Sequence, residues 1–289
     1  MPYDNTQGWP HGGIFWEGAK EGTWSDEQPP MRTDNPWNEG YIWSDLNDDA
    51  IPQANEFTQP EGNVRTYTAS VANNGDFWLY DLAKNAMVLV PLQGFTPNGS
   101  PIWDYTKRFI YPLPEPFTTG IGKFEYDSEK DVMIIAGYSS TDTKDDGTWL
   151  GRRIARYDNW YKNAGNWTPT WVKEIPAYQF THNTQNQFVY NNESHMPNSM
   201  ALAGDYIFFA YFGGFDAGGV YVSKLSDGEY VGKMLPDFKA FDCDETYCIR
   251  AYKRLNGEYL VSVNDHALLP LSYTGGVNPV IVQTATQFL

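Results

Sequence analysis

The chain contains little cysteine and no long apolar stretch. Cysteine occurs only as Cys243 and Cys248 among the 289 residues, too few for the dense disulfide framework of a small secreted scaffold. With no histidine beside them they make a poor zinc site, and a local disulfide and two free thiols on adjacent strands stay open as alternatives. No apolar run approaches the roughly 20 residues of a membrane-spanning helix, so we expect no membrane insertion.

Histidine is scarce as well, and the four histidines are not spaced as metal ligands. No pair has the H-x-x-x-H separation that places two imidazoles on one helix face, and no G-x-S-x-G nucleophile elbow is present. Sequence motifs therefore assign no catalytic residue. The histidines are His11, His182, His195 and His266.

Basic residues are few: 20 Lys and Arg stand against 36 Asp and Glu, which gives a net charge of −16 and a pI near 4.5. Such a chain repels the phosphate backbone, so nucleic acid is a poor partner. Calcium, cationic surfaces and neutral sugars are compatible with the charge. Strong acidity is also common among secreted and salt-tolerant proteins, and that explanation accounts for most of it.

Sustained helical periodicity is absent, whereas aromatic residues reach 16% and the chain has 26 Gly and 19 Pro, a mixture that suits sheets and turns. From about residue 63, strand-like segments recur in groups of four, one group per ~45–75 residues, with a Gly, Asp or Asn turn between the first two strands each time. A β-sandwich need not repeat in this way. The sequence therefore predicts an all-β protein, a β-propeller of four-stranded antiparallel blades.

We expect a single β-propeller domain over residues 1–289, with an irregular N-terminal region at 1–62 and repeated blades at 63–289. About five blades can be counted, and the last group of strands is short. Either a closed ring borrows its missing strand from residues 12–45, or the chain is part of a larger propeller of roughly six to seven blades.

Residues 45–56, the acidic loop, have the only spacing that indicates a specific chemistry. They match the EF-hand-type pattern D-x-D/N-x-D/N-G-x5-E, except that Ala50 replaces the usual glycine at a cost on the order of 1 kcal/mol. Neither flank has a helical period, so we expect a structural Ca2+ clip rather than a sensor, with an ion-free acidic surface loop as the alternative. The expected ligands are the side chains of Asp45, Asn47, Asp49, Gln53 and Glu56 and the carbonyl of Ile51.

A second acidic stretch, residues 141–147, lacks a closing glutamate and contains Lys144. A lysine among the acids competes with a cation for their oxygens, which makes metal binding the weaker interpretation. We therefore expect a solvated loop there.

Polar side chains near the starts of the expected inner strands form the candidate ligand site. His195 lies just before the innermost strand of the third group, where a propeller faces the mouth of its central channel. A role as general base or ligand contact competes with that of an ordinary polar loop histidine. Arg65, Asn198 and Arg250 lie near comparable ends of inner strands.

Most aromatic rings are expected to fill the space between blades, as large side chains do in stacked sheets. A few lie in loops instead, and these are better candidates for exposed contacts such as stacking platforms for sugars. They include Trp24, Trp37 and Trp167.

Several segments resemble bacterial secreted, NHL-like β-propellers. The run Gly75–Asp81 resembles their G-D-I/L-W second strand, and residues 92–105 resemble their G-hydrophobic-D-x-N-G-x-P-x-Y-D loop. The acidic loop is similar to the W-x-D-x-N-G-D-G…Q-x-x-E-F segment that often sits between their blades. The resemblance implies a propeller fold, bound calcium and export, which would make the protein secreted, periplasmic or attached to a bacterial cell surface. It assigns no catalytic residue.

These observations predict a calcium-stabilised extracellular module that binds a glycan or a protein without catalysis, or that joins a larger extracellular assembly. The alternative is a propeller enzyme, a lyase or hydrolase that acts on a polysaccharide or a lactone. A lactonase-like site would hold a metal in the central channel through Glu, Asn and Asp side chains, of which only Asn198 clearly aligns. A lyase would need His or Tyr together with Arg, which His195 and Arg250 could supply.

Overall fold

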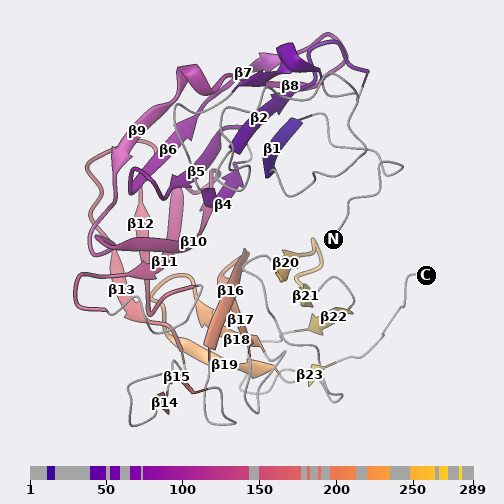
Figure 1. The fold of residues 1–289 in the computed structure, drawn as a ribbon. Helices are drawn as coiled ribbons and strands as arrows, with labels where there is room; N and C mark the ends of the chain where they lie inside the picture. Colours follow the sequence, from indigo (N-terminus) through magenta and orange to yellow (C-terminus); the bar gives the residue numbers. More distant parts are fainter. Residues whose placement is uncertain are drawn as a thin grey trace. The chain divides into compact units, whose positions relative to one another are not determined.

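The computed structural model describes thirteen stretches of the chain (Figure 1). Apart from short 3-10 turns, every regular element in these stretches is a β-strand. Within the same residues, no helix has the length and hydropathy needed to cross a membrane. The described stretches are residues 12–16, 40–49, 53–58, 66–72, 74–142, 150–176, 181–182, 188–189, 196–212, 220–234, 248–263, 267–272 and 280–281.

Most strands belong to four-stranded antiparallel sheets whose strands lie side by side in the order in which they occur along the chain; we call each such sheet a blade. The first blade comprises β4 (Thr66–Val71), β5 (Phe77–Asp81), β6 (Ala86–Val90) and β9 (Phe109–Pro112). The second comprises β10 (Gly120–Asp127), β11 (Val132–Tyr138), β12 (Arg153–Asp158) and β13 (Trp171–Glu174). The third comprises β16 (Met196–Ala203), β17 (Tyr206–Phe212), β18 (Val220–Lys224) and β19 (Tyr230–Met234). The fourth comprises β20 (Ile249–Lys253), β21 (Tyr259–Val263), β22 (Ala267–Ser272) and β23 (Val280–Ile281).

Three smaller sheets accompany the blades. One is three-stranded, in the order β1 (Gly12–Trp16), β2 (Gly40–Ser44), β3 (Phe57–Thr58). The others are the hairpins β7–β8 (Leu92–Phe95, Pro101–Trp103) and β14–β15 (Thr181–His182, Phe188–Val189). Among the described residues, β1 and β2 pair with each other and the fourth blade has four strands of its own. A closed ring that borrows a strand from residues 12–45 and a larger propeller both stay predictions.

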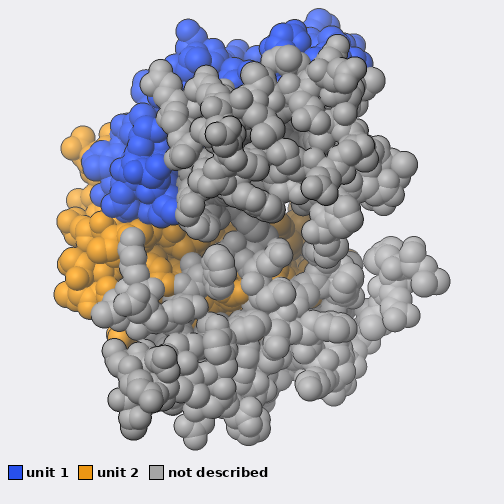
Figure 2. Space-filling view, in the orientation of Figure 1, with its two compact units in different colours: residues 1–113, 126–129 blue, residues 114–125, 130–289 orange. Residues whose placement is uncertain are grey.

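The chain divides into two compact units (Figure 2). Residues 1–113 and 126–129 form the first, which contains the first blade, the three-stranded sheet and the β7–β8 hairpin. Residues 114–125 and 130–289 form the second, which contains the other blades apart from the end of β10. The prediction of one propeller domain over the whole chain stays a prediction.

Within the second unit, neighbouring blades stack face to face. Side chains of a strand alternate between the two faces of its sheet. Alternate side chains of β17 therefore belong to two different buried clusters, one on each face of the third blade. Ile207 and Phe209 share a buried cluster with Ile134 of the second blade. Phe208, from the opposite face of β17, shares a buried cluster with Val261 of the fourth blade. Both faces of β17, a middle strand of the third blade, are thus covered by neighbouring blades of the second unit.

This repeated, stacked arrangement of four-stranded sheets confirms the predicted fold class, an all-β protein with β-propeller blades. Turn residues are a reason that the sequence folds this way locally. Gly75, Gly204 and Gly257 all lie in turns between the first and second strands of a blade, with φ of 85°, 56° and 89°. Glycine adopts this region without the steric cost that a Cβ imposes.

Trp167 corrects the expectation of an exposed loop aromatic. Its ring stacks on Trp160 with centroids 3.8 Å apart and planes 3° apart, and its Nε1 donates to the Trp160 carbonyl. Both rings are buried in the second unit. Trp24 and Trp37 lie outside the described residues. Cys248 is disulfide-bonded, whereas Cys243, the only other cysteine in the sequence, lies outside the described residues.

Candidate metal loop and inner-strand cluster

The acidic loop is closed at its base by pairing between the strands that flank it. Strand β2 runs directly into Asp45, and β3 follows Glu56, the last residue of a short 3-10 turn. In the β2–β3 pair, Trp43 lies opposite Phe57. This brings the first and last residues of the loop together and agrees with the expected absence of EF-hand helices. Asp45 and Glu56 are both buried, with 0% and 3% of their surface exposed.

The Glu56 carboxylate crosses the loop and accepts three hydrogen bonds. Its Oε1 accepts from the Leu46 N–H at 2.9 Å. Its Oε2 accepts from Trp43 Nε1 at 2.9 Å and from the Gln53 N–H at 3.1 Å. A buried carboxylate is tolerated only when its charge is satisfied in this way or by a cation. Glu56 therefore holds both ends of the loop in place.

The other predicted side-chain ligands also converge. Oδ1 of Asp45 and Oδ1 of Asn47 both accept from the Asp49 N–H, at 3.1 and 3.2 Å. Asn47 Nδ2 and Gln53 Nε2 both donate to Asp49 Oδ2, at 3.0 and 2.7 Å, and Asn47 Nδ2 also donates to Gln53 Oε1 at 3.0 Å. Hydrogen bonds thus connect Asp45, Asn47, Asp49 and Gln53 within the loop, whereas the Glu56 carboxylate bonds to Trp43 and to the loop backbone. Ala50 and the predicted carbonyl ligand, Ile51, lie outside the described residues.

The donor set suits calcium, because calcium prefers carboxylate, amide and carbonyl oxygens. Two buried carboxylates, Asp45 and Glu56, are a second reason that a cation fits. Among the described residues, no three His, Cys, Asp or Glu side chains gather into a metal-binding group. A calcium ion would therefore depend also on the amide oxygens of Asn47 and Gln53 and on a backbone carbonyl.

Asp48, which the spacing did not single out, connects the acidic loop to the β7–β8 hairpin. It adopts φ 61°, and its Oδ1 accepts from the hydroxyls of Thr96 and Ser100, both at 2.5 Å. Ser44, at the end of β2, exchanges hydrogen bonds with the backbone of Trp103 on β8. The acidic loop is therefore fastened to this hairpin at its tip and at its base.

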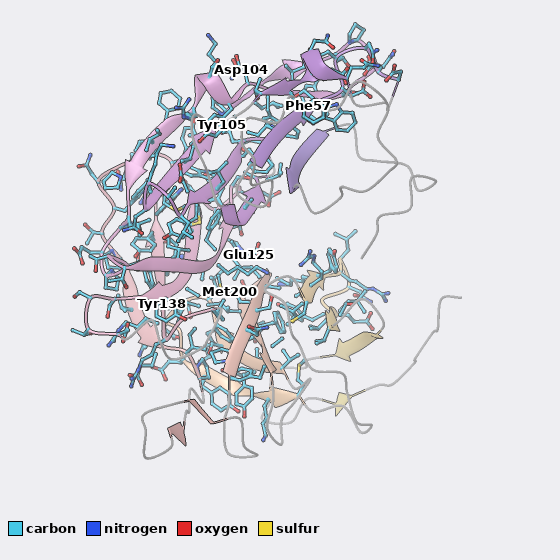
Figure 3. All side chains as sticks on the ribbon, in the orientation of Figure 1. Phe57, Asp104, Tyr105, Glu125, Tyr138 and Met200 are labelled. Atoms are coloured by element: carbon cyan, nitrogen blue, oxygen red, sulfur yellow. The ribbon has the colours of Figure 1, made fainter. Side chains whose placement is uncertain are left out.

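A second polar group lies on the first strands of three successive blades. Lys123 on β10 is 3% exposed, and its Nζ donates to Ser199 Oγ on β16 at 3.3 Å and pairs with Glu125 Oε1 at 3.5 Å. Asn198, beside Ser199, is 1% exposed. Arg250 on β20 is exposed, and its positive charge lowers the pKa of Lys123, so we include it with this group. We call these five residues the inner-strand cluster; Figure 3 labels Glu125 on β10 and Met200, which follows Ser199 on β16.

Burial lowers the pKa of Lys123, because removal from water disfavours the charged ammonium. The positive charge of Arg250 lowers it further, whereas the Glu125 carboxylate acts in the opposite direction without cancelling the effect. A lysine with a lowered pKa near a serine hydroxyl is a chemically capable pair. Ser199 is fully buried, however, and of the five residues of the cluster only Glu125 and Arg250 reach solvent.

Of the four predicted ligand residues, Asn198 lies next to Ser199 on β16 and Arg250 lies on β20, and their role in binding a ligand stays a prediction. The other two, His195 and Arg65, lie outside the described residues. Sequence reasoning missed Lys123, Glu125 and Ser199. Lys123 could have been noticed from the sequence, because it is a lysine within the expected strand 120–126, where the residues before Glu125 are otherwise apolar or glycine. Charged residues are seldom fully buried without a partner, so such a lysine predicts a polar partner nearby.

The second acidic stretch departs from expectation at one residue. Asp142 is not solvated: its side chain is 2% exposed and pairs with Arg153 Nε at 3.1 Å. Its Oδ2 also accepts from the backbone N–H and the hydroxyl of Ser139, at 2.8 and 2.7 Å. Burial raises the pKa of this carboxyl, but the hydrogen bonds from Ser139 and Arg153 outweigh burial and leave the pKa lowered. Residues 143–149 lie outside the described residues.

A Lys123→Met variant is expected to change how stability depends on pH. The lowered pKa in the folded protein means that the unfolded chain binds the proton more tightly, so the wild-type free energy of unfolding rises with pH from the folded pKa up to 10.5. The slope is at most about 1.4 kcal/mol per pH unit. The methionine side chain has no proton to lose, so the Lys123→Met variant lacks this gain. The stability of the variant relative to wild type is therefore highest at neutral pH and declines toward alkaline pH.

Urea unfolding of both proteins across this range measures the difference. Lys130→Met is the control, because Lys130 is exposed and its replacement should leave the pH dependence nearly unchanged. Parallel curves for wild type and Lys123→Met would contradict a lowered pKa.

No family model and no curated protein sequence matches the chain. Among solved structures, a virginiamycin B lyase from Staphylococcus aureus in complex with quinupristin is 12% identical, with a TM-score of 0.41 over 86% of this chain and 64% of that one. A protein from Lactobacillus plantarum is 10% identical, with a TM-score of 0.44 over 86% of this chain and 65% of that one. The Cps50 (Swd1) β-propeller domain from Myceliophteria thermophila is 12% identical, with a TM-score of 0.41 over 81% of this chain and 58% of that one.

The chain spans less than two thirds of the length of each of these three structures. These similarities are too low to support the fold assignment, which rests on the strand order and on the stacking of the blades described above. The class that these features define is a β-propeller-type repeat of four-stranded blades.

Proposed function

We propose that this chain is a calcium-stabilised, extracellular β-propeller module that binds a glycan or a protein partner through its inner strands and catalyses no reaction. The observation that carries the proposal is the inner-strand cluster. Three successive blades contribute to it, and its solvent-reaching groups, Glu125 and Arg250, offer one acceptor and one charged donor. Such a pair suits a polar ligand with hydroxyl or carboxyl groups.

Two features support an extracellular location. The disulfide of Cys248 is of the kind that persists in oxidising compartments. The acidic loop offers a donor set suited to calcium, and the extracellular concentration of calcium favours loops of moderate affinity. Membership of a larger extracellular assembly is part of the same proposal.

An enzymatic role is the second candidate, and a specific contact favours it. Lys123 Nζ lies 3.3 Å from Ser199 Oγ, and a lysine with a lowered pKa can act as the base for a serine nucleophile. The exposure of Ser199 and Lys123, 0% and 3%, argues against this role, since a substrate must reach the nucleophile. A lyase or hydrolase would require the inner strands to open around Ser199.

An Arg250→Ala variant is expected to bind its partner at least about tenfold more weakly than wild type, because it loses a charge-assisted hydrogen bond. Binding to arrays of immobilised bacterial and plant glycans, neutral and acidic, gives the measurement. Arg254→Ala is the matched control, since Arg254 is exposed and pairs with Glu258 in the turn after β20. Equal losses in both variants would contradict an inner-strand site.

The same incubations distinguish the enzyme from the binding module. Mass spectrometry of the glycans after incubation should find them intact. Shortened or unsaturated sugars that disappear with Lys123→Met would overturn the non-catalytic role and support the Ser199–Lys123 pair as the catalytic machinery.

A further inference from the structure

Strand β9 is the last strand of the first blade, and among the described residues no strand pairs with its outer edge. Figure 1 shows β9 beside β6, the neighbour with which it pairs over Phe109–Pro112. Successive residues of an antiparallel strand direct their N–H and C=O groups to opposite edges. Phe109 and Ile110 are consecutive, so one of them directs both backbone groups away from β6. An edge of this kind is a template for a further strand.

Large apolar side chains are exposed on both faces of this edge. Successive side chains of a strand point to opposite faces of its sheet, so Phe109 and Ile110 lie on opposite faces. They are 53% and 45% exposed. Edge strands are commonly protected by charged side chains within the strand, and β9, with the sequence FIYP, contains none. A strand added here would cover apolar surface on both faces of the sheet.

The aromatic face of the edge is held in place by the core of the first blade. The Phe109 ring stacks on that of Tyr111, with centroids 6.5 Å apart and planes 18° apart. The Tyr111 ring lies in turn 6.1 Å from that of Trp78, whose surface is 0% exposed. Phe109 is therefore already positioned, and little conformational entropy is lost when a partner covers it.

Two basic residues that form no ion pair precede the strand. Lys107 is exposed and Arg108 is half-buried, and neither pairs with a carboxylate in the part of the chain that the structure describes. Arg108 lies 4.5 Å from the centre of the Tyr105 ring, and its Nε is buried without an acceptor. The nearest acid in the sequence, Asp104, accepts instead from the N–H and hydroxyl of Thr106. The Lys107 ammonium is thus available without breaking a contact, and Arg108 adds a second positive charge from its place on Tyr105.

The corresponding edge strand of the second blade, β13, lacks this combination. It also exposes an apolar side chain, Val172, at 37%. Its charged residues, however, are paired within the chain: Lys173 with Glu229 at 2.9 Å and Glu174 with Arg152 at 3.0 Å. The edge of β9 therefore differs in having positive charge that the chain itself does not balance, although the net charge is −16.

We propose that the outer edge of β9 binds an extended segment of a protein partner as a fifth strand, and that this segment carries apolar residues and a carboxylate. The apolar side chains pack on Phe109 and Ile110, and the carboxylate pairs with Lys107. Salt at physiological strength screens the more distant negative charges of the chain over about 8 Å, so the nearest charges decide the preference. The surface is separate from the inner-strand cluster and does not depend on the function proposed for it.

A second copy of this chain suits the edge less well than a different protein. In an antiparallel pair of two β9 strands centred on each other, Phe109 of each copy would lie opposite Pro112 of the other. Proline has no N–H to donate to the ladder. Two copies would also bring together two net charges of −16, which repel each other.

The probes are two labelled, end-capped peptides of eight residues, both of alternating valine and threonine, one with two aspartates at its C-terminal end and one with two asparagines there. Fluorescence anisotropy on the full chain is expected to show the aspartate peptide binding about tenfold more tightly. Lys107→Gln should remove most of this difference. Phe109→Thr should weaken both peptides about tenfold, because threonine suits a strand but removes apolar surface.

The matched controls are Lys162→Gln, an exposed lysine elsewhere, and Val172→Thr on the edge strand β13. Both should bind the peptides as wild type does. Hydrogen exchange with the aspartate peptide bound should slow at residues 109–112 and stay unchanged at residues 171–174. Equal affinities for the two peptides, no binding of either, or protection at residues 171–174 instead would overturn the proposal. A dimer in sedimentation velocity that Phe109→Thr dissociates would also overturn it, since a second copy would then cover the edge.

Discussion

A Glu56→Ala variant is expected to lose about 3 kcal/mol of its free energy of unfolding, because it leaves several buried donors without an acceptor. The carboxylate is 3% exposed and accepts from Trp43 Nε1 and from the backbone of Leu46 and Gln53. Urea unfolding measures the loss. Glu129→Ala is the control, since Glu129 lies exposed in the turn after β10 and its replacement should change stability by less than about 0.5 kcal/mol.

A calcium chelator distinguishes stabilisation by a bound ion from stabilisation by the hydrogen bonds of Glu56. If calcium binds the acidic loop, a chelator should lower the melting temperature of the wild type, by the equivalent of about 2.7 kcal/mol where the ion was present at 100 times its Kd. Glu56→Ala should lose most of this response, because glutamate is the bidentate ligand of such loops. A wild-type melting temperature unchanged by the chelator would contradict calcium binding, even with Glu56→Ala destabilised.

The second large effect is expected from Gly151→Ala, at about 2–5 kcal/mol of destabilisation. Gly151 has φ 92°, and a Cβ there would lie 2.4 Å from the carbonyl carbon and oxygen of Gly137 on β11. Left-handed backbone costs a residue with a side chain about 1–2 kcal/mol, and overpacking adds about 1–3 kcal/mol. The Gly137 carbonyl cannot move away freely, because it accepts from the Arg152 N–H at 3.1 Å.

Gly257→Ala is the matched control for this prediction. Its φ of 89° is nearly the same, but a Cβ at Gly257 would meet nothing within 4 Å. It should therefore cost only the conformational part, about 1–2 kcal/mol. Similar losses in the two variants, measured by urea unfolding, would show that the close approach to Gly137 contributes nothing.

Gly151 also affects the position of the inner-strand cluster, because it packs against Gly137, which in turn packs against β10. Gly137, against which Gly151 packs, faces Gly120 at the start of β10, and a Cβ at Gly137 would lie 2.5 Å from the Gly120 carbonyl oxygen. Lys123 is on the same strand, three residues further on. The close approach of these glycines therefore helps to set the position of the cluster's buried lysine.

The acidic loop shows what local sequence can predict about a site. Asp45, Asn47, Asp49 and Glu56 lie within twelve consecutive residues, so local hydrogen bonds among near neighbours are enough to close the loop. The same holds for the blades. Apolar runs such as residues 132–138, separated by turns at glycine or asparagine, indicate strands because alternation and turn chemistry are local properties.

Contacts between distant residues were not predictable in this way. Asp48 meets Thr96, 48 residues away, and Lys123 meets Ser199, 76 residues away. Trp167 lies in a loop by its local sequence, yet it is buried because Trp160 stacks against it. A single sequence contains no record of which distant segments pack together.

The sequence by itself determined the strands, the turns and the short-range hydrogen bonds that close the acidic loop, because each depends on neighbours within a few residues. The tertiary structure alone decided that the loop is fastened to the β7–β8 hairpin and that Lys123 is buried between first strands of successive blades. The physical reason is that burial, desolvation and pairing of a charge depend on what packs around it, which is settled only when the blades stack.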